Sequence, residues 1–593
     1  MLDKVKEGKM KTKTLSRFKK MIKPYWKVII VVTILSIIID LAELVKPYII
    51  QQIIDNFLRE KNNIFNNITI DQMVIFYVLL VIFGNVIDYI NRCVSYNLGE
   101  SVVYNLRLKL FKFIEKANLT FHDKTPSGKL YVRVTSDTED VYSLFTDVIT
   151  TLPKDLILIF SLIGMMIYLS VKLSIINVFM IIFLVFTTVI ITKQMNKIFS
   201  DSKNKRTKLN TFLAESIYGV KLIKIFNRQK IKQKECEKNT KDYTDATIKL
   251  AYFWGTLPGI INLIENLSIS AVVLFCVYKI WGINLEIGII YLFISYLRKL
   301  IDPIDRIIEN MEVVTDAFSS IDKIYDILDQ EKDLENFDSG IILKDVKGKI
   351  EFKNVWFAYE KEDWILKDVS FTINPGESAA LVGKTGSGKT TITALISRFY
   401  KIQKGEILLD GININDINLI SLRSNIGTIL QDPFIFARSM KDNIKMYSEI
   451  TDETVDESVK LASAENFVKS LPNGIEEVSM ERGNSYSAGQ KQLVAFARIF
   501  AKNPSIFILD EATANIDTIT EELIQKSVDK LLSNKTSICI AHRLATIVNV
   551  DKIIVLDKGR IIEQGNHNDL LKNDGYYARL YNSYYLSLGG VEC

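Results

Sequence analysis

The stretch of sequence that decides the fold of the second half of the chain is residues 379–399, AALVGKTGSGKTTITALISRF. Within it, the segment 383–390 (GKTGSGKT) fits the pattern GxxxxGK[ST], placed after an apolar run that predicts a strand and before a run that predicts a helix. Glycines in such a loop let backbone N–H groups surround phosphates at a helix N-terminus. Lys389 can then reach the outer phosphates of a nucleotide, and the Thr390 hydroxyl can ligate Mg²⁺. A chance glycine-rich turn would lack this context, so the stretch predicts a phosphate-binding loop.

A second candidate site, this one acidic, follows about 120 residues after the phosphate loop, where the apolar run 506–509 ends in Asp510 and Glu511. A buried strand tolerates two carboxylates at its end only if something neutralises them. Asp510 is expected to hold the metal through water, and Glu511 to act as general base on the attacking water. The alternative, an acidic surface turn, does not explain the pairing with a phosphate loop.

The chain after about residue 330 consists of short β-rich runs separated by Gly, Pro and Asn, with helical stretches between several of them. Strands that alternate with helices predict a mainly parallel sheet covered on both faces. The expected strands are 350–352, 369–373, 379–382, 405–409, 506–509 and 537–540.

The first half of the chain has the composition of a membrane domain. The whole sequence is 48% hydrophobic with 24% charged residues and a mean hydropathy of +0.15, values between those of soluble and membrane proteins, so the two halves must differ. Six apolar segments are each near or above the roughly 20 residues that cross a bilayer as a helix. They are residues 27–57, 71–97, 151–170, 173–192, 254–280 and 284–303.

Lysine and arginine gather in the long connections after the second and fourth spans, which predicts that these connections and both termini are cytoplasmic. The connections keep helical periodicity, so they are interpreted as membrane helices prolonged into the cytoplasm. Each such hairpin has a break at its tip, at residues 121–128 and 226–229. Taken alone, either tip could be an ordinary turn between helices.

Charge and cysteine content exclude several other classes of protein. A net charge of +5 over 593 residues gives little support to nucleic-acid binding. The 5 cysteines are scattered without CxxC spacing, which argues against a disulfide framework or a zinc site. The basic N-terminal segment precedes an apolar stretch too long for a signal peptide, so a retained membrane helix is expected.

The motifs of the second half, taken in order, resemble the ATPase of ABC transporters, and specifically the half-transporter exporters whose membrane domain comes first. The order is an aromatic Tyr359, the phosphate loop 383–390 (Walker A), Gln431 in LQDPF, the signature YSAGQ at 486–490, the strand 506–510 with Glu511 (Walker B), the D-loop 514–517 and His542. This resemblance implies a membrane all-α six-helix exporter domain followed by an α/β P-loop ATPase domain with antiparallel β and helical subdomains. The expected boundaries are 1–22 for a cytoplasmic segment, 23–330 for the exporter domain, 331–348 for a linker and 349–593 for the ATP-binding domain.

The resemblance also implies a role for each motif residue. ATP would be bound by Tyr359, Gly383, Lys384, Thr385, Gly386, Ser387, Gly388, Lys389, Thr390, Thr391, Ser487, Gly489, Gln490 and Asp510. The catalytic residues would be Glu511, His542 and Gln431, and Mg²⁺ would be held by Thr390, Gln431 and Asp510. In this family the signature helix faces the ATP of the other subunit, so two ATPase domains must close on two ATPs, and the hairpin tips would act as coupling helices.

The expected function is ATP-driven export of hydrophobic or amphiphilic compounds across the cell membrane, with a lipid flippase as the alternative. Two further alternatives are a soluble ABC ATPase, which would require the six apolar segments to be something other than membrane spans, and an importer. The signature departs from the family's Leu-Ser-Gly-Gly-Gln at Tyr486 and Ala488, while the Walker residues are intact. This favours a heterodimer with a different half-transporter over a homodimer whose signature tolerates both changes.

Three carboxylates lie within the expected spans, Asp40 and Glu43 in the first and Glu265 in the fifth. A carboxylate in a membrane core costs roughly 2.5–3.5 kcal/mol on insertion scales, so such residues usually face a cavity. One hypothesis is that they line the cargo path and favour cationic amphiphiles. The other is that they lie near the water interface or bond to neighbouring helices.

Overall fold

The computed structural model divides into two compact units, and each is described here by itself. One unit is residues 128–330 together with the chain before residue 113, and the other is residues 113–127 together with the chain from residue 331 onward. The structure describes residues 13–59, 70–278, 280, 286–360, 362–510, 518–532, 535–540 and 547–587.

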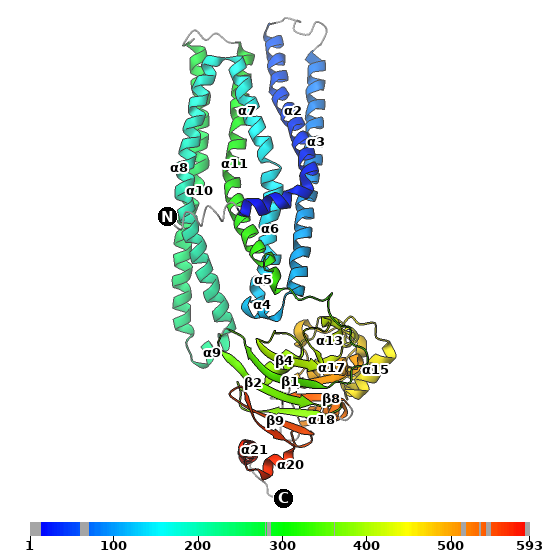
Figure 1. Ribbon diagram of the computed structural model, residues 1–593. Helices are drawn as coiled ribbons and strands as arrows, with labels where there is room; N and C mark the ends of the chain where they lie inside the picture. Colours follow the sequence, from blue (N-terminus) through cyan, green and yellow to red (C-terminus); the bar gives the residue numbers. More distant parts are fainter. Residues whose placement is uncertain are drawn as a thin grey trace. The chain divides into compact units, whose positions relative to one another are not determined.

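The first unit is built from long helices (Figure 1). The long ones are α2 (Trp26–Arg59), α3 (Ile70–Lys116), α7 (Leu152–Leu169), α8 (Val171–Tyr218), α10 (Gln229–Val277) and α11 (Ile287–Leu328). Shorter pieces join them: α5 (Ser127–Val134), α6 (Ser136–Ser143), a π-helix over Leu144–Ile149 and α9 (Val220–Ile225). Each of the six expected spans therefore overlaps one long helix over most of its length.

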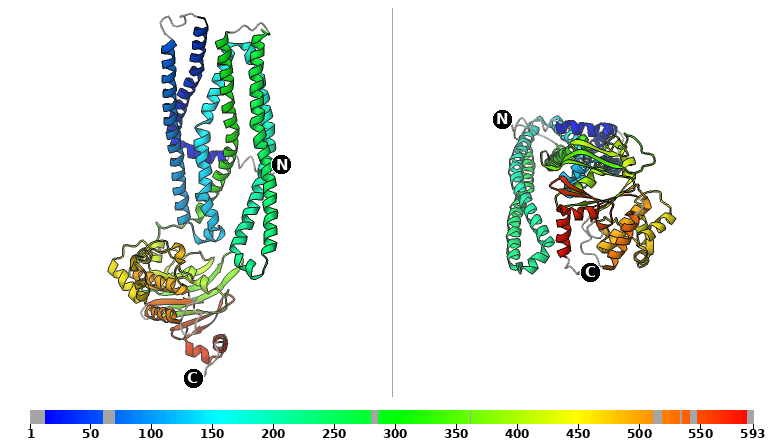
Figure 2. Two further views of the ribbon diagram at one scale, coloured as in Figure 1. Left: turned by 180° about the vertical axis from the view of Figure 1, so that it is seen from behind. Right: turned by 60° about the horizontal axis from the view of Figure 1, so that its bottom comes forward.

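The expected continuation of helices beyond their apolar segments is confirmed. α3, α8 and α10 run on without interruption for 47, 48 and 49 residues, well beyond their apolar segments. α8 and α10 lie side by side, joined at α9, in every view of Figures 1 and 2. Because a helix rises about 1.5 Å per residue, each of these helices is about 70 Å long, more than twice the hydrocarbon thickness of a bilayer.

Four of the described helical stretches are long and apolar enough to cross a membrane by length and composition: 13–55, 70–116, 127–169 and 229–277. The other two expected spans lie in α8 and α11; the described apolar part of α8, Val171–Met180, is shorter than a span. In α11, charged residues such as Arg298 and Asp302 interrupt the apolar run. Many large apolar side chains on α3 and α8 are exposed, as expected of surfaces that face lipid.

The core of this unit lies where α7, α8, α10 and α11 meet. Fully buried side chains there include Leu162, Leu173, Val272 and Phe293. Tyr296 of α11 is also buried, and its hydroxyl donates to the backbone carbonyl of Leu44 in α2 at 2.9 Å. A buried tyrosine needs such a partner, so this bond fixes α2 against α11.

A helix over residues 13–22 is fastened to the end of α11 by one buried arginine. The guanidinium of Arg17, whose side chain is 8% exposed, donates to Asp322 at 2.9 Å and to Asp329 at 2.6 Å. The Phe18 ring packs against Phe145 and Phe318 at centroid distances of 6.2 and 5.3 Å. The attachment of this helix therefore combines an ion pair with an aromatic contact.

We expect Arg17→Met to lower the thermal stability of the first unit by about 1–3 kcal/mol, because Asp322 and Asp329 lose their arginine partner and retain Thr14 and Lys13. The cost lies below that of a fully buried pair, since the Asp329 side chain is 45% exposed. Thermal unfolding in lipid nanodiscs measures it. Lys20→Met, at an exposed position of the same helix, should leave the transition unchanged. Equal shifts for the two variants would contradict the role of Arg17 in fastening this helix to α11.

The second unit contains two sheets. The first is antiparallel, in the order β2-β1-β4-β5, and the second has the order β10-β9-β3-β8-β7-β6. The strands are β1 (Ile350–Ala358), β2 (Trp364–Ile373), β3 (Ser378–Val382), β4 (Lys404–Leu409), β5 (Ile412–Asn413), β6 (Ile426–Ile429), β7 (Ile506–Asp510), β8 (Thr536–Ile540), β9 (Lys552–Asp557) and β10 (Arg560–Gly565). The larger sheet is parallel except for β10, which confirms the expected mainly parallel sheet.

Hydrophobic cores lie on both faces of the larger sheet. One combines the sheet with β1, β2 and α12 (Lys389–Ile396). The other packs helices against the opposite face: α14 (Met440–Lys445), α15 (Asp452–Leu461), α16 (Glu465–Lys469), α17 (Ala488–Lys502), α18 (Thr518–Leu532), α20 (His567–Lys572) and α21 (Tyr576–Ser587). The central strands β3 and β7 are buried over nearly all of their length and read as apolar runs.

The tip of the first inner hairpin is a short helix, α4 (Leu119–Lys124), that belongs to the second unit. Asn118 caps it by accepting from the Phe121 N–H at 2.9 Å. Its chain is tied to the segment after α11, because the Asn118 N–H donates to the Asp333 carbonyl at 2.7 Å and the Glu335 N–H to the Lys116 carbonyl at 2.8 Å. The tip is thus a docked helix rather than a free turn.

Candidate functional site

The phosphate loop lies between β3 and α12, as expected from the sequence. Gly383 and Gly388 have φ angles of +154° and +104°, which L side chains rarely adopt. A β-carbon at Gly383 would come 2.2 Å from the Leu556 carbonyl oxygen. The loop is therefore closely packed, and its shape requires glycine at these positions.

Two buried polar groups of the loop fit a phosphate ligand. Lys389 is 6% exposed, and its ammonium donates to the carbonyls of Gly383 at 2.7 Å and Lys384 at 3.0 Å. Burial lowers the pKa of Lys389, although the charge of Asp510 acts in the opposite direction. Ser387 Oγ is buried without a hydrogen-bond partner among the described residues, and a phosphate oxygen would satisfy it.

The aromatic residue Tyr359, just after β1, lies close to this loop. Its hydroxyl and the Thr391 hydroxyl, on the third residue of α12, are 3.2 Å apart. The rings of Phe357 and Tyr400 stand nearly perpendicular to it, at centroid distances of 4.9 and 5.0 Å. Tyr359 is 45% exposed, so part of its ring is free to stack on a flat heterocycle.

Some of the other residues expected around the phosphates lie within the described part of the chain, and some lie outside it. Asp510 ends β7, and β7, β8 and β3 are parallel, so Asp510 and the phosphate loop lie at the same edge of the sheet. Gln431 follows β6 on an exposed segment, and Thr390 is exposed at the start of α12. Glu511, the D-loop 514–517 and His542 lie outside the described residues.

The signature segment forms the N-terminus of α17. Ser487 is the N-cap: its hydroxyl accepts from the Gln490 N–H, and the Gln490 side chain accepts from the Ser487 N–H, which is a complete capping box. Ala488 is exposed at this helix start, and Gly489 is buried. Tyr486 is held inside its own domain, with its ring 5.5 Å from that of Phe467.

The transmembrane carboxylates differ in their surroundings. Glu43 forms ion pairs with Lys46 and with Lys299 of α11, so it is bonded to a neighbouring helix. Asp40 is 2% exposed, and neither of its carboxylate oxygens has a hydrogen-bond partner among the described residues. Glu265 lies 3.7 Å from Arg298. The hypothesis that these carboxylates bond to neighbouring helices therefore describes Glu43. Asp40, in contrast, is a buried carboxylate that no ion pair of the described chain neutralises.

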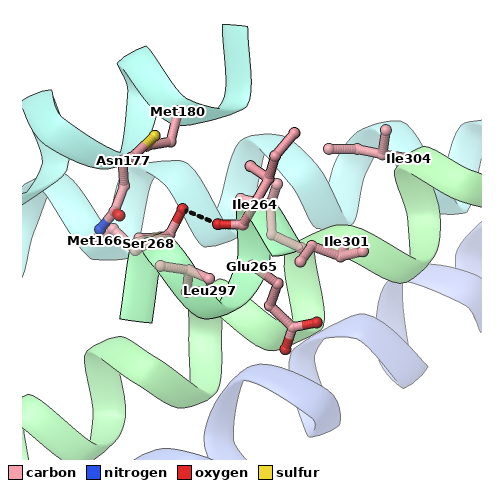
Figure 3. A pocket seen from close by; sticks show the side chains of 10 residues that line it. Met166, Asn177, Met180, Ile264, Glu265, Ser268, Leu297, Ile301 and Ile304 are labelled. Carbon is pink, nitrogen blue, oxygen red and sulfur yellow. Dashed lines mark hydrogen bonds between the residues drawn. The ribbon is translucent and has the colours of Figure 1, made fainter. Parts of the chain in front are cut away.

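Glu265 borders a small cavity between α7, α8, α10 and α11 (Figure 3). The cavity has about 20 Å³ of space, room for about one water molecule. Asn177 lines it, and neither amide atom of Asn177 has a partner within the described chain. Figure 3 shows the Glu265 carboxylate on the far side of the cavity from Asn177, so the two polar groups do not form one site.

Together these features define the class of the protein. A phosphate loop, a carboxylate at the same sheet edge and an aromatic platform in one unit are the parts of a P-loop ATPase. Long apolar helices in the other unit of the same chain attach that ATPase to a membrane. The chain is thus a membrane-bound P-loop ATPase.

Comparisons with known proteins identify the family. Residues 29–304 match the family described as ABC transporter transmembrane region, and residues 366–514 match the family described as ABC transporter. The chain is 34% identical over 571 residues to the Streptococcus pneumoniae protein exp8, named provisionally as an ABC transporter ATP-binding protein, covering 96% of each chain. It is 31% identical over 574 residues to an ATP-dependent lipid A-core flippase of Haemophilus ducreyi, covering 96% of this chain and 97% of that one.

A further relative is YgaD of Bacillus subtilis, which bears a provisional multidrug-export name and is 31% identical over 571 residues, covering 96% of this chain and 98% of that one. A solved bacterial Atm1-family ABC exporter with ATP bound matches with a TM-score of 0.78 at 26% identity, over 96% of this chain and 99% of that one. The chain belongs to the ABC transporter family, as an exporter with fused transmembrane and ATP-binding domains. It is an ABC ATPase coupled to transport, and ABC exporters act as dimers.

Proposed function

We propose that this protein exports hydrophobic or amphiphilic compounds across the cell membrane by alternating access, with both termini on the cytoplasmic side. The observation that carries the proposal is a cavity of about 340 Å³ between α10 and α11. Its walls combine apolar residues with charged ones, which suits a cargo that has both characters. The lining residues are Pro258, Ile261, Asn262, Glu265, Arg298, Lys299, Ile301, Asp302 and Asp305.

Substrate-stimulated ATP hydrolysis in native-like lipid tests the cargo class. We expect amphiphilic drugs to raise the ATPase rate and peptides to leave it unchanged. Because two of the relatives reported above are named for multidrug export and for lipid flipping, the assay is paired with transbilayer movement of a fluorescent lipid. ATP-dependent lipid movement without drug stimulation would replace the proposal by a lipid flippase.

At the nucleotide site, we propose that Lys389 and the loop amides bind the phosphates and that Tyr359 stacks on adenine. Thr390, Gln431 and Asp510 would hold Mg²⁺, which when bound withdraws charge from the β- and γ-phosphates. Glu511 would accept the proton of the attacking water, and His542 would donate to the γ-phosphate. Support comes from the position of Asp510 at the carboxyl edge of the sheet beside the phosphate loop.

The partner subunit is proposed to be a different half-transporter. Ser487, Gly489 and Gln490 would face the ATP bound by the partner, where the helix N-terminus favours phosphate. The Ala488 methyl group lies exposed at that helix start, where the family signature has glycine. A methyl group there would hold the partner's nucleotide away from the helix, so hydrolysis would occur mainly at Lys389, Asp510 and Glu511 of this chain.

We expect the chain purified alone to hydrolyse ATP about tenfold more slowly than with its partner, a difference of about 1.4 kcal/mol in the barrier. Cargo should not stimulate it. Ala488→Gly should restore part of the rate in the chain alone, because it removes the methyl group. Full, cargo-stimulated ATPase from a homodimer of the unmodified chain would show that the signature tolerates Tyr486 and Ala488.

A further inference from the structure

Tyr400 contacts both the proposed adenine platform and α4. Its ring lies 5.0 Å from that of Tyr359, at an interplanar angle of 90°. Its hydroxyl donates to Asp123 Oδ2 of α4 at 2.7 Å. Burial, followed by the bond to Asp123, raises the pKa of the Tyr400 hydroxyl, so it stays a neutral donor at physiological pH. One side chain thus joins the nucleotide site to the hairpin tip inside the same compact unit.

The backbone that carries Tyr400 is firmly held. Arg398, with φ of +50°, donates to the carbonyls of Ile414 and Ile417, both at 2.6 Å. The guanidinium of Arg423 lies 4.9 Å from the centre of the Phe399 ring. This turn follows directly after α12, which begins at the phosphate loop. Tyr400 therefore lies four residues after the end of the helix whose start would bind phosphate.

α4 is in turn anchored to α3. Phe121 of α4 is 3% exposed, and its ring packs edge-on against Phe113 of α3 at 5.6 Å. The His122 ring lies 3.1 Å from the Ile114 carbonyl. α3 is continuous from Ile70 to Lys116, so a displacement of α4 acts on a helix that extends into the transmembrane unit.

We propose that Tyr400 is a positioning residue that couples adenine stacking on Tyr359 to the position of α4 through its hydrogen bond to Asp123. The inference rests on the proposed role of Tyr359. A ligand that orders Tyr359 restricts the Tyr400 ring and hence the bond to Asp123. By linkage, any arrangement of α4 that holds Asp123 in place also favours nucleotide binding by the same free energy.

The test is hydrogen exchange on the full chain in lipid nanodiscs, with and without the non-hydrolysable nucleotide AMP-PNP. In the unmodified chain the nucleotide should slow exchange both in the phosphate loop and in residues 119–124. Tyr400→Phe keeps the ring and removes the hydroxyl. It should reduce the slowing in residues 119–124 by roughly 2- to 10-fold, the range for one hydrogen bond, while the phosphate loop keeps its full response.

The matched control is Tyr447→Phe, at an exposed tyrosine of the same domain whose ring lies 4.6 Å from the Arg438 guanidinium; it should leave both responses unchanged. Asp123→Ala and the double variant should match Tyr400→Phe, because all three remove the same hydrogen bond. A full response of residues 119–124 in Tyr400→Phe, or additive effects in the double variant, would overturn the inference. An unmodified chain whose phosphate loop does not respond would overturn the proposed function, and this inference with it.

Discussion

Replacing Lys389 by alanine is expected to weaken ATP binding by at least tenfold and to abolish measurable hydrolysis. Lys389 is buried in the phosphate loop, where its ammonium donates to two loop carbonyls. Alanine removes both the charge that would face the outer phosphates and the bonds that shape the loop. Charge-assisted bonds to a buried group contribute about 1.5–3 kcal/mol each, which corresponds to a loss of roughly 10- to 150-fold. Equilibrium binding of a fluorescent ATP analogue measures it.

Lys353→Ala is the control for this variant, because Lys353 is an exposed lysine on β1 of the same domain. It should bind the analogue as the unmodified chain does. The thermal transition of Lys389→Ala without nucleotide should stay within a few degrees of that of the unmodified protein, since the loop lies at the edge of the sheet. Normal nucleotide affinity in a folded Lys389→Ala protein would show that this loop is not the phosphate site.

Replacing Glu511 by glutamine is expected to leave ATP binding nearly intact and to lower turnover by about 100-fold or more. Glutamine keeps the size of the side chain but cannot accept the proton of the attacking water, and positioned general bases contribute about 10²–10⁴ in rate. The expected separation of binding from turnover distinguishes this variant from Lys389→Ala. Single-turnover hydrolysis and analogue binding are measured on the same preparation.

Glu522→Gln serves as its control, since Glu522 is an exposed glutamate in α18 of the same domain. Turnover in this control should match that of the unmodified chain. If Glu511→Gln hydrolysed ATP at the normal rate, Glu511 would not be the general base. The proposal that hydrolysis occurs mainly at Lys389, Asp510 and Glu511 of this chain would then be wrong.

Much of the architecture was predictable because its signals are local. A membrane helix must satisfy all backbone hydrogen bonds within one apolar segment, so four of the expected spans could each be located from a single window of sequence. The phosphate loop was equally local, because its glycines and Lys389 act through their own backbone and neighbours. The expected strands were found wherever apolar runs were bounded by turn residues.

Several elements were missed where the signal was short or depended on distant partners. β6 has four residues and is a strand through its pairing with β7, over 70 residues further on. The hairpin of β9 and β10 turns at Lys558 and Gly559, both with positive φ, a turn signal that could have been used. The contact between Tyr359 and Tyr400 joins residues 41 positions apart, and no pattern within either segment indicates it.

By itself, the sequence determined that this chain is a membrane-embedded P-loop ATPase of the ABC exporter type, because apolar length, the glycine loop and the order of motifs are properties of consecutive residues. Only the tertiary structure decided that Glu43 is paired with Lys299 while Asp40 is left without a partner among the described residues, and that α4 belongs with the ATPase domain. Burial and charge pairing depend on which side chains meet across different elements. Glu43 and Lys299 are more than 250 residues apart in the sequence and are brought together by the packing of α2 against α11. Sequence periodicity carries no information about contacts between residues so far apart in the chain.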